Sequence, residues 1–222
     1  MELSEAMRTT GAVRAFTSDP VPPEVLHRVL DDARFAPSGG NQQGWHVTLV
    51  RDPALRRRLA DMSARTWERY LAEQAAGFRA FNPLDPAPPD VEVPEGLRPH
   101  PMLEAIEDVP EVLLVTVDLR TLAVMDRDLD RFSIIGGASL YPFVQNLLLA
   151  ARNQGLGGVV TTFLAASEPE AGPLVGLPEG HAIAALVGLG TPVHQVTRLR
   201  RHPVEAFTTI DRVDGPAFTL DA

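Results

Sequence analysis

The most continuous apolar pattern in the chain lies at residues 140–153. On a helix of 3.6 residues per turn its apolar side chains cover two adjacent faces, and only a narrow strip carrying Asn146 and Asn153 is polar. A helix that is apolar over most of its circumference is typical of a protein core or of a subunit interface. Pro142 fits the first turn if Ser139 caps the helix, whereas deeper inside it would force a kink; the sequence allows both.

A glycine-rich turn follows this helix and leads into a β-branched run. Gly155 stands where a left-handed residue often ends a helix, and Gly157 and Gly158 begin a strand that continues through Val159–Thr162. Glycines at the start of a strand allow a flat ligand to approach the backbone closely. A tight helix-to-strand turn without a ligand explains these glycines at least as well.

The remaining pattern alternates helices and short strands, which predicts an α/β or α+β domain with a small sheet covered by helices. Prolines crowd residues 82–101, so this stretch is expected to be a long excursion without regular structure, either a lid or a disordered surface loop. The arginines of the helix at 52–80 are expected on an exposed face. The periodicity predicts helices at 2–8, 22–36, 52–80 and 168–177, and strands at 46–50, 112–117 and 182–189.

Composition narrows the class of protein. A chain of 222 residues, 45% of them hydrophobic, can hold one substantial core, and a single domain is the default. The formal charge of −9 argues against a general nucleic-acid or anionic-membrane surface, and no apolar run reaches the length of a membrane span. The absence of cysteine excludes disulfides and thiol chemistry. We therefore expect a cytoplasmic protein.

Two polar features stand out against this background. The loop 37–45 offers the side chains of Ser38, Asn41 and Gln43 between glycines, a set that can bind the edge of a heteroaromatic ring or can simply build a loop. The cluster at 198–202 contains three arginines and a histidine in an otherwise acidic chain. This cluster suits a discrete anion such as a phosphate, although a solvated surface cluster has the same composition.

Several common catalytic patterns are absent. No glycine fingerprint of a dinucleotide fold follows a strand, and neither a P-loop nor a nucleophile elbow is present. The histidines lack ligand spacing, so we expect no metal site. Asp126, Asp128 and Asp130 alternate as in a calcium loop but lack its glycine and closing glutamate, which predicts a solvated acidic turn. No side chain is predicted to act as a nucleophile or a general acid.

Three separated segments together are similar to one family. The first is Val13–Phe16 with the loop Pro37–Trp45, the second is Gln145–Gly157, and the third runs from Gly190–Pro192 to Arg200–Val204. In their order and spacing they resemble the nitroreductase family of flavin mononucleotide (FMN) enzymes. Gly11 and Ala12 depart from the family's phosphate-binding Arg-Ser, and Gly44 replaces a proline of the loop.

The resemblance implies an α+β homodimer with a small mixed sheet flanked by helices and with the central helix at the interface. It implies a single domain over 1–222, in which a lid lies at about 82–101 and a tail at 205–222 packs on the partner subunit. FMN would bind between the subunits. The resemblance carries over four groups of cofactor-binding residues. Arg14 would contact the ribityl or pyrimidine part of the flavin, and the backbone of Leu156, Gly157 and Gly158 would lie beside flavin N5. The loop residues are Pro37, Ser38, Gly39, Asn41 and Gln43, of which Ser38 and Asn41 would reach the flavin from the opposite subunit. Arg200 and Arg201 would bind the phosphate.

The implied activity is hydride transfer from NADH or NADPH through flavin N5 to a planar organic acceptor, such as a nitroaromatic or a quinone, by a ping-pong mechanism. Donor and acceptor would use the same space in turn. A flavin-binding protein without turnover is the alternative from another class. Within the enzyme class, a dehalogenase, a ring dehydrogenase or a flavin-destroying enzyme remains open.

Overall fold

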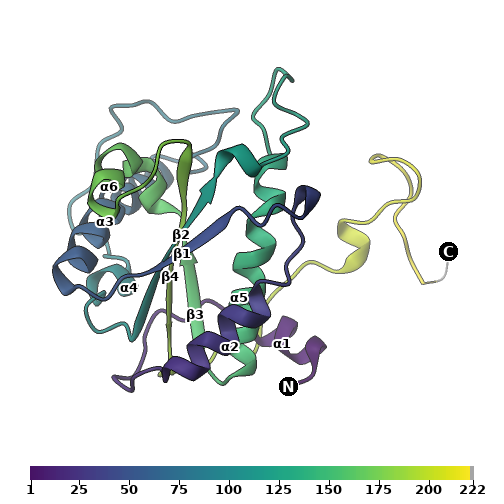
Figure 1. Cartoon of the computed structure of the whole chain (residues 1–222). Helices are drawn as coiled ribbons and strands as arrows, with labels where there is room; N and C mark the ends of the chain where they lie inside the picture. Colours follow the sequence, from purple (N-terminus) through teal and green to yellow (C-terminus); the bar gives the residue numbers. More distant parts are fainter. Residues whose placement is uncertain (221–222) are drawn as a thin grey trace.

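The computed structural model describes residues 1–220 and contains a four-stranded sheet in the order β1-β2-β4-β3 (Figure 1). The strands are β1 (Trp45–Leu49), β2 (Glu111–Asp118), β3 (Gly157–Thr161) and β4 (His181–Gly190). All three strand pairs are antiparallel, with an irregularity in register between Val115 and Thr116. The sequence therefore located the strands to within about two residues at each end.

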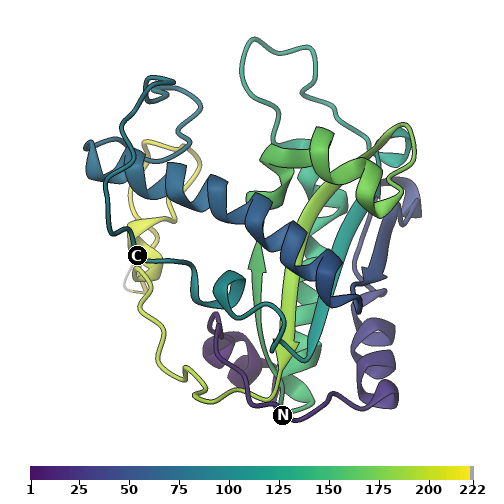
Figure 2. The same ribbon diagram turned by 90° about the vertical axis from the view of Figure 1, so that its left-hand side faces the viewer.

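Helices cover both faces of this sheet (Figures 1 and 2). One face packs against α2 (Pro23–Ala33) and α5 (Tyr141–Asn153), and the other against α3 (Pro53–Ala75), α4 (Pro101–Glu104) and α6 (Glu168–Val175). The short helix α1 (Leu3–Thr9) contacts α5. Short 3-10 helices lie at Gly39–Asn41, Leu119–Thr121, Ile135–Ser139, Phe163–Ser167 and Val204–Ala206.

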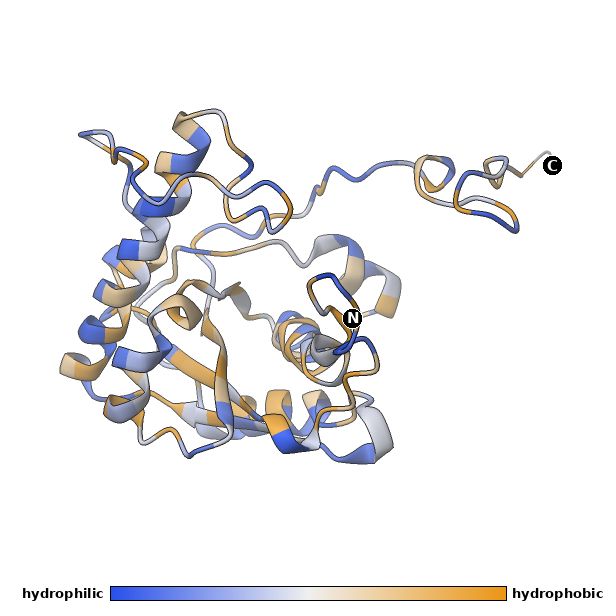
Figure 3. Ribbon diagram, turned by 90° about the horizontal axis from the view of Figure 1, so that it is seen from above, coloured by the Kyte–Doolittle hydropathy of each residue, from blue (hydrophilic) through white to orange (hydrophobic). Residues whose placement is uncertain are grey.

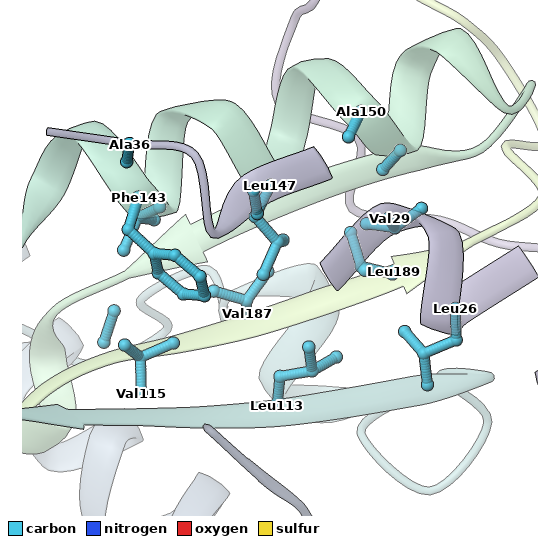
Figure 4. Close-up of a cluster of buried hydrophobic side chains, with 14 of the residues drawn as sticks. Leu26, Val29, Ala36, Leu113, Val115, Phe143, Leu147, Ala150, Val187 and Leu189 are labelled. Atoms are coloured by element: carbon cyan, nitrogen blue, oxygen red, sulfur yellow. The ribbon is translucent and has the colours of Figure 1, made fainter. Parts of the chain in front are cut away.

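The central strands are buried on both faces, and alternate residues feed two separate cores. Leu113 and Val115 of β2 point toward α2 and α5, whereas Val112 and Leu114 point toward α3 and α4. Figure 4 shows the first core, where Leu147 of α5 lies over Val187 of β4. Each fully buried side chain of this size stabilises the fold by about 2 kcal/mol relative to exposure. The near-continuous apolar run of β2 follows from this double burial.

The central helix α5 begins one residue before Pro142, so the proline lies in the first turn and produces no kink. Ser139 does not cap the helix; its Oγ accepts a hydrogen bond from the Gly39 backbone N–H at 2.9 Å. Phe143 on the same helix stacks on Trp45 of β1, with ring centroids 4.9 Å apart. The helix thereby connects the sheet to the polar loop that precedes β1.

The expected α+β class with a small sheet between helices is confirmed, but the sheet is antiparallel rather than mixed. Among residues 1–220, the parallel pairing consists of one isolated bridge between Ala12 and Gly158. The helix α3 ends at Ala75, five residues before the predicted end at Ala80, because Gly77 adopts a positive φ and the Glu73 carboxylate binds the N–H of Phe81.

One arginine of α3 does not lie on the expected exposed face. Arg56 is buried, and its guanidinium donates to the carbonyl oxygens of Val50 at 2.7 Å and Val109 at 2.6 Å. It also donates to the backbone carbonyl oxygens of Glu107 and Pro110. Arg56 therefore joins the end of β1 to the loop before β2, and this contact holds α3 against the sheet.

The end of the chain leaves the body of the molecule. The segment after β4 extends as an arm (Figure 3), and its apolar side chains Phe207 and Val213 are 70% and 99% exposed. The tail predicted to pack on a partner covers 205–222, of which 221 and 222 lie outside the described residues. Over residues 1–220, no helix has both the length and the apolar character needed to cross a membrane.

Candidate functional site

The N-terminal segment lies along the edge of β3 and continues beside the end of β4. The N–H of Val13 donates to Gly158 O at 2.9 Å, and Phe16 forms an isolated bridge with Pro192. Arg14 lies between these two contacts, so the backbone on both sides of it is fixed by the sheet. Its exposed side chain reaches the wall of a cavity beyond the end of β3.

This cavity has a volume of about 480 Å³ and is formed by four parts of the chain. Arg14 comes from the N-terminal segment, Trp67 and Tyr70 from α3, and the remaining walls from residues 98–101 and 160–163. Its size falls in the range of small-molecule and cofactor sites, which are usually apolar with a few polar groups. The residues fit an aromatic ligand with an anionic or carbonyl edge, since one wall is aromatic and another carries a guanidinium.

The aromatic wall is a cluster of four rings. Trp67 stacks on Tyr70 at 5.5 Å and approaches Phe163 at 5.6 Å. His100 meets Trp67 edge-on at 5.3 Å and Phe163 edge-on at 5.9 Å. Offset and edge-on arrangements of this kind are the favoured geometries of aromatic pairs. The cluster thus forms a rigid, water-excluding side to the cavity.

His100 connects this cluster to the arginine. Its side chain is buried, and Nε2 accepts a hydrogen bond from Nε of Arg14 at 3.4 Å. Burial and, next, the charge of Arg14 lower the pKa of His100 to about 4. The imidazole is therefore neutral near pH 7, with its proton on Nδ1.

The proline-rich segment has no helix or strand from residue 82 to residue 100, as predicted. Side chains of α3 bind carbonyl oxygens of its backbone. Trp67 Nε1 donates to Arg98 O at 2.9 Å, and the Arg69 guanidinium donates to the carbonyl oxygens of Pro88 and Pro89. These contacts place residues 98–100 against the cavity. That the segment acts as a lid stays a prediction.

The glycines that begin β3 are packed against the protein's own side chains. A Cβ on Gly157 would lie 2.7 Å from Val13, and a Cβ on Gly158 would lie 2.6 Å from Leu189. Close packing therefore accounts for both glycines. The cavity is lined by residues 160–163 further along the strand, and the expected contact of the Leu156, Gly157 and Gly158 backbone with a flavin stays a prediction.

The polar loop before β1 is bonded within itself. Ser38 Oγ accepts from the Gln43 N–H at 2.9 Å, and the Gln43 side chain donates to Asn41. Both Asn41 and Gln43 adopt a positive φ. Gly44 is required locally, because a Cβ there would lie 1.8 Å from Thr121 Oγ1. That contact gives a reason for the departure from proline at this position.

Within residues 1–220 the loop and Arg14 line separate cavities. Pro37, Ser38 and Gly39 line a different cavity of about 250 Å³, whose other side is formed by the 3-10 helix 135–139 and by Ala123 and Met125. That cavity shares no residue with the one beside Arg14. The predicted site residues thus fall into two groups in a single chain.

The arm that carries the predicted phosphate ligands lies against residues 9–11 of the N-terminal segment. After the Phe16–Pro192 bridge, the arm runs back along the N-terminal segment: Gln195 donates to Thr9 O at 3.0 Å, and Val196 and Leu199 contact Gly11. Arg200 and Arg201 follow directly and are exposed. The only hydrogen bond that the structure gives either side chain within residues 1–220 joins Arg201 to Arg200 O.

The sequence did not identify four residues of this cavity, namely Trp67, Tyr70, His100 and Phe163. Their types are common in cores, and only the fold brings them together. Phe163 carried a signal, since it directly follows the glycine-rich strand. Among residues 1–220 no group of acidic or histidine side chains could hold a metal, and Asp126 is buried in its loop rather than solvated as predicted.

Comparison with known proteins gives a consistent result. The family model described as "Nitroreductase family" matches residues 7–191. A protein named NADH dehydrogenase from Thermus thermophilus is 30% identical over 194 residues, which is 87% of this chain and 88% of that protein. The structure is similar to the NADPH:FMN oxidoreductase of Vibrio harveyi complexed with NAD+, with a TM-score of 0.68 at 22% identity, covering 98% of this chain and 80% of that one. It is also similar to oxidised iodotyrosine deiodinase bound to FMN and 3-iodo-L-tyrosine, with a TM-score of 0.63 at 23% identity, covering 91% of this chain and 96% of that one.

Proposed function

Because the chain belongs to the nitroreductase family, we propose that it is an FMN-dependent enzyme that oxidises NADH or NADPH and reduces a small planar organic acceptor. The observation that carries this proposal is the cavity of about 480 Å³, which joins an aromatic wall to the guanidinium of Arg14. A planar ring system with a polar edge and a phosphate matches both parts. Nitroaromatics and quinones are the acceptors we propose first.

Bound FMN would supply the hydride chemistry, and the chain's own residues would hold and orient it. Arg14 would bind an oxygen-rich edge of the cofactor, because its terminal nitrogens have no hydrogen-bond partner within residues 1–220. Arg200 and Arg201 would bind the phosphate from the arm. The rings of Trp67 and Phe163 would exclude water from one side, which strengthens the electrostatic contacts inside.

We propose a homodimer in which each cavity is completed by the partner subunit. Two observations support this: the loop residues Ser38 and Asn41 lie away from Arg14 in their own protomer, and the arm carries exposed apolar side chains such as Phe207 and Val213. The loop of one protomer would then reach the cavity of the other, and the arm would cover the partner's surface. The proline-rich segment would act as a lid over the acceptor. We also propose that the protein is cytoplasmic.

Reconstitution of the apoprotein with FMN tests this proposal. Analytical ultracentrifugation should show a yellow dimer. In steady-state assays this dimer should oxidise NADH or NADPH when menadione or a nitroaromatic is present, with the parallel double-reciprocal plots of a ping-pong cycle. Arg14→Ala should weaken FMN binding about a hundredfold. Arg34→Ala, at the exposed arginine that directly follows α2 and pairs with Asp31, should leave it unchanged. No measurable affinity for FMN, or a monomer that retains it fully, would contradict the proposal. A yellow dimer without turnover would instead indicate a flavin-binding protein.

Reductive dehalogenation is the second candidate, because the likeness to the deiodinase structure covers almost the whole chain. Incubation of the reduced protein with 3-iodo-L-tyrosine distinguishes the two. Release of iodide at a rate comparable to nitroaromatic reduction would favour the dehalogenase.

A further inference from the structure

His100 occupies an unusual position in the molecule. It is 5% exposed, it ends the proline-rich segment, and it directly precedes α4. Its Nε2 accepts from Arg14 Nε, while its Nδ1 is buried and has no hydrogen-bond partner within residues 1–220. A buried donor without a partner is unfavourable, and an apolar side chain of similar shape would avoid that cost. Packing alone therefore does not explain a histidine here.

The partner of Arg14 is as informative as the position of His100. Within residues 1–220, Arg14 forms no ion pair with a carboxylate; the group that fixes its Nε is an uncharged imidazole. A carboxylate in that place would orient the guanidinium but would also neutralise its field. A neutral acceptor orients Arg14 and leaves the full positive charge for a ligand.

The aromatic cluster explains how His100 itself is held. Trp67 and Phe163 meet the imidazole edge-on. Trp67 Nε1 also donates to the carbonyl oxygen of Arg98, which lies two residues before His100. The ring thus cannot rotate without disturbing α3 or the 3-10 helix at 163–167. Arg14, by contrast, is an exposed side chain on a segment without helix, and it has many rotamers available in the absence of such a contact.

We propose that His100 is a positioning residue that orients the Arg14 guanidinium toward the cofactor, so that the end of the proline-rich segment takes part in FMN binding through Arg14. The inference rests on the proposed function, in which Arg14 binds FMN. It assigns to His100 a role in affinity that acts through Arg14 alone. Burial and, next, the charge of Arg14 keep His100 in its neutral, accepting form by lowering its pKa.

A double-mutant cycle on FMN affinity tests the proposal. His100→Leu removes the acceptor at similar volume and should weaken binding about tenfold, the effect of one hydrogen bond to a charged group. His100→Gln places an amide oxygen near the position of Nε2 and should restore binding to within about threefold. In the Arg14→Ala background, His100→Leu should have no further effect. His27→Gln, an exposed histidine on α2, is the matched control and should bind as the native protein does.

A second measurement follows Arg14 without the cofactor. In the apoprotein, the Nε–H resonance of Arg14 in ¹H–¹⁵N spectra should be slow to exchange in the native protein and in His100→Gln, and fast in His100→Leu. Native affinity in a folded His100→Leu variant, or an equal loss with and without Arg14, would overturn the proposal while leaving the proposed function intact. If the native protein binds no FMN, the proposed function fails and the role in affinity fails with it.

Discussion

The Nε atom of Arg69 lies 2.6 Å from a carboxylate oxygen of Glu73, one turn further along α3, and both side chains also bind the backbone of the segment that follows the helix. Glu73 accepts from the Phe81 N–H at 2.7 Å, and Arg69 donates to the carbonyl oxygens of Pro88 and Pro89. The hydrogen bond from Phe81, then that from Arg69, lowers the pKa of Glu73. The Arg69–Glu73 ion pair thus binds the chain after α3 at two places, Phe81 and the pair Pro88 and Pro89, and so fixes the start of the proline-rich segment.

Removing this carboxylate should loosen that segment. We expect Glu73→Ala to lower the free energy of unfolding by about 2 kcal/mol, because the Phe81 N–H and the Arg69 guanidinium lose a charged partner. Limited trypsin digestion should then cut at Arg79 far faster than in the native protein. Glu68→Ala, an exposed glutamate on the same helix, should change neither quantity. Native resistance to trypsin in Glu73→Ala would mean that the prolines order the segment unaided.

Stability should fall in mild acid because of His100. Its pKa is lowered to about 4 in the folded protein, against an ordinary value of 6.5 that we take for the unfolded chain. The unfolded chain therefore takes up the proton first, and the free energy of unfolding should decrease as pH falls from 6.5 to 4 by about 3 kcal/mol. Urea unfolding at a series of pH values measures the slope. His100→Leu should flatten it, whereas His27→Gln should not; equal slopes in both variants would refute the assignment.

Arg56 should be among the most sensitive positions of α3. Replacing it by alanine leaves the buried carbonyl oxygens of Val50 and Val109 without a donor, which should cost about 3 kcal/mol in urea unfolding. Arg58→Ala, two residues along and exposed, should stay within about 0.5 kcal/mol of the native protein. Similar losses in both variants would point to helix propensity instead of the buried contact.

The loop 125–134 should depend on the carboxylate of Asp126. This group accepts from the Ile134 N–H at 3.0 Å, from Ser133 Oγ at 2.7 Å and from Arg131, and these contacts, the Ile134 bond first, hold its pKa far below the usual range. We expect Asp126→Asn to reduce the hydrogen-exchange protection of the Ile134 amide at neutral pH. Asp128→Asn, whose carboxylate is exposed, is the control and should keep native protection. An unchanged amide in Asp126→Asn would show that the loop is ordered without this charge.

The elements that the sequence predicted well are those that local pattern determines. The all-round apolar character of α5 and the buried runs of β2 and β4 are visible residue by residue, and each element lies where it was expected. The sequence did not predict the position of a side chain when that position depends on contacts with residues distant in sequence. Arg56 is surrounded by charged neighbours along the chain and was therefore expected in solvent, but its acceptors belong to strand ends that only the tertiary structure brings near.

The same distinction holds for the candidate site. Arg14 and the polar loop stand out because their residue types are unusual in their surroundings. Trp67, His100 and Phe163 do not, since an aromatic residue on a helix or a histidine among prolines has many ordinary explanations. Their significance depends on three segments meeting at one edge of the sheet, a property of topology that no local pattern contains.

The bond between Val13 and Gly158 also has a consequence for biosynthesis. On the ribosome, the segment that carries Arg14 emerges well before the strand edge against which it docks, because Val13 and Gly158 are far apart in sequence. Contacts so distant in sequence form late and slow the approach to the native state. The nascent polypeptide should therefore acquire its early helices first, while the cavity beside Arg14 can form only after β3 has been made.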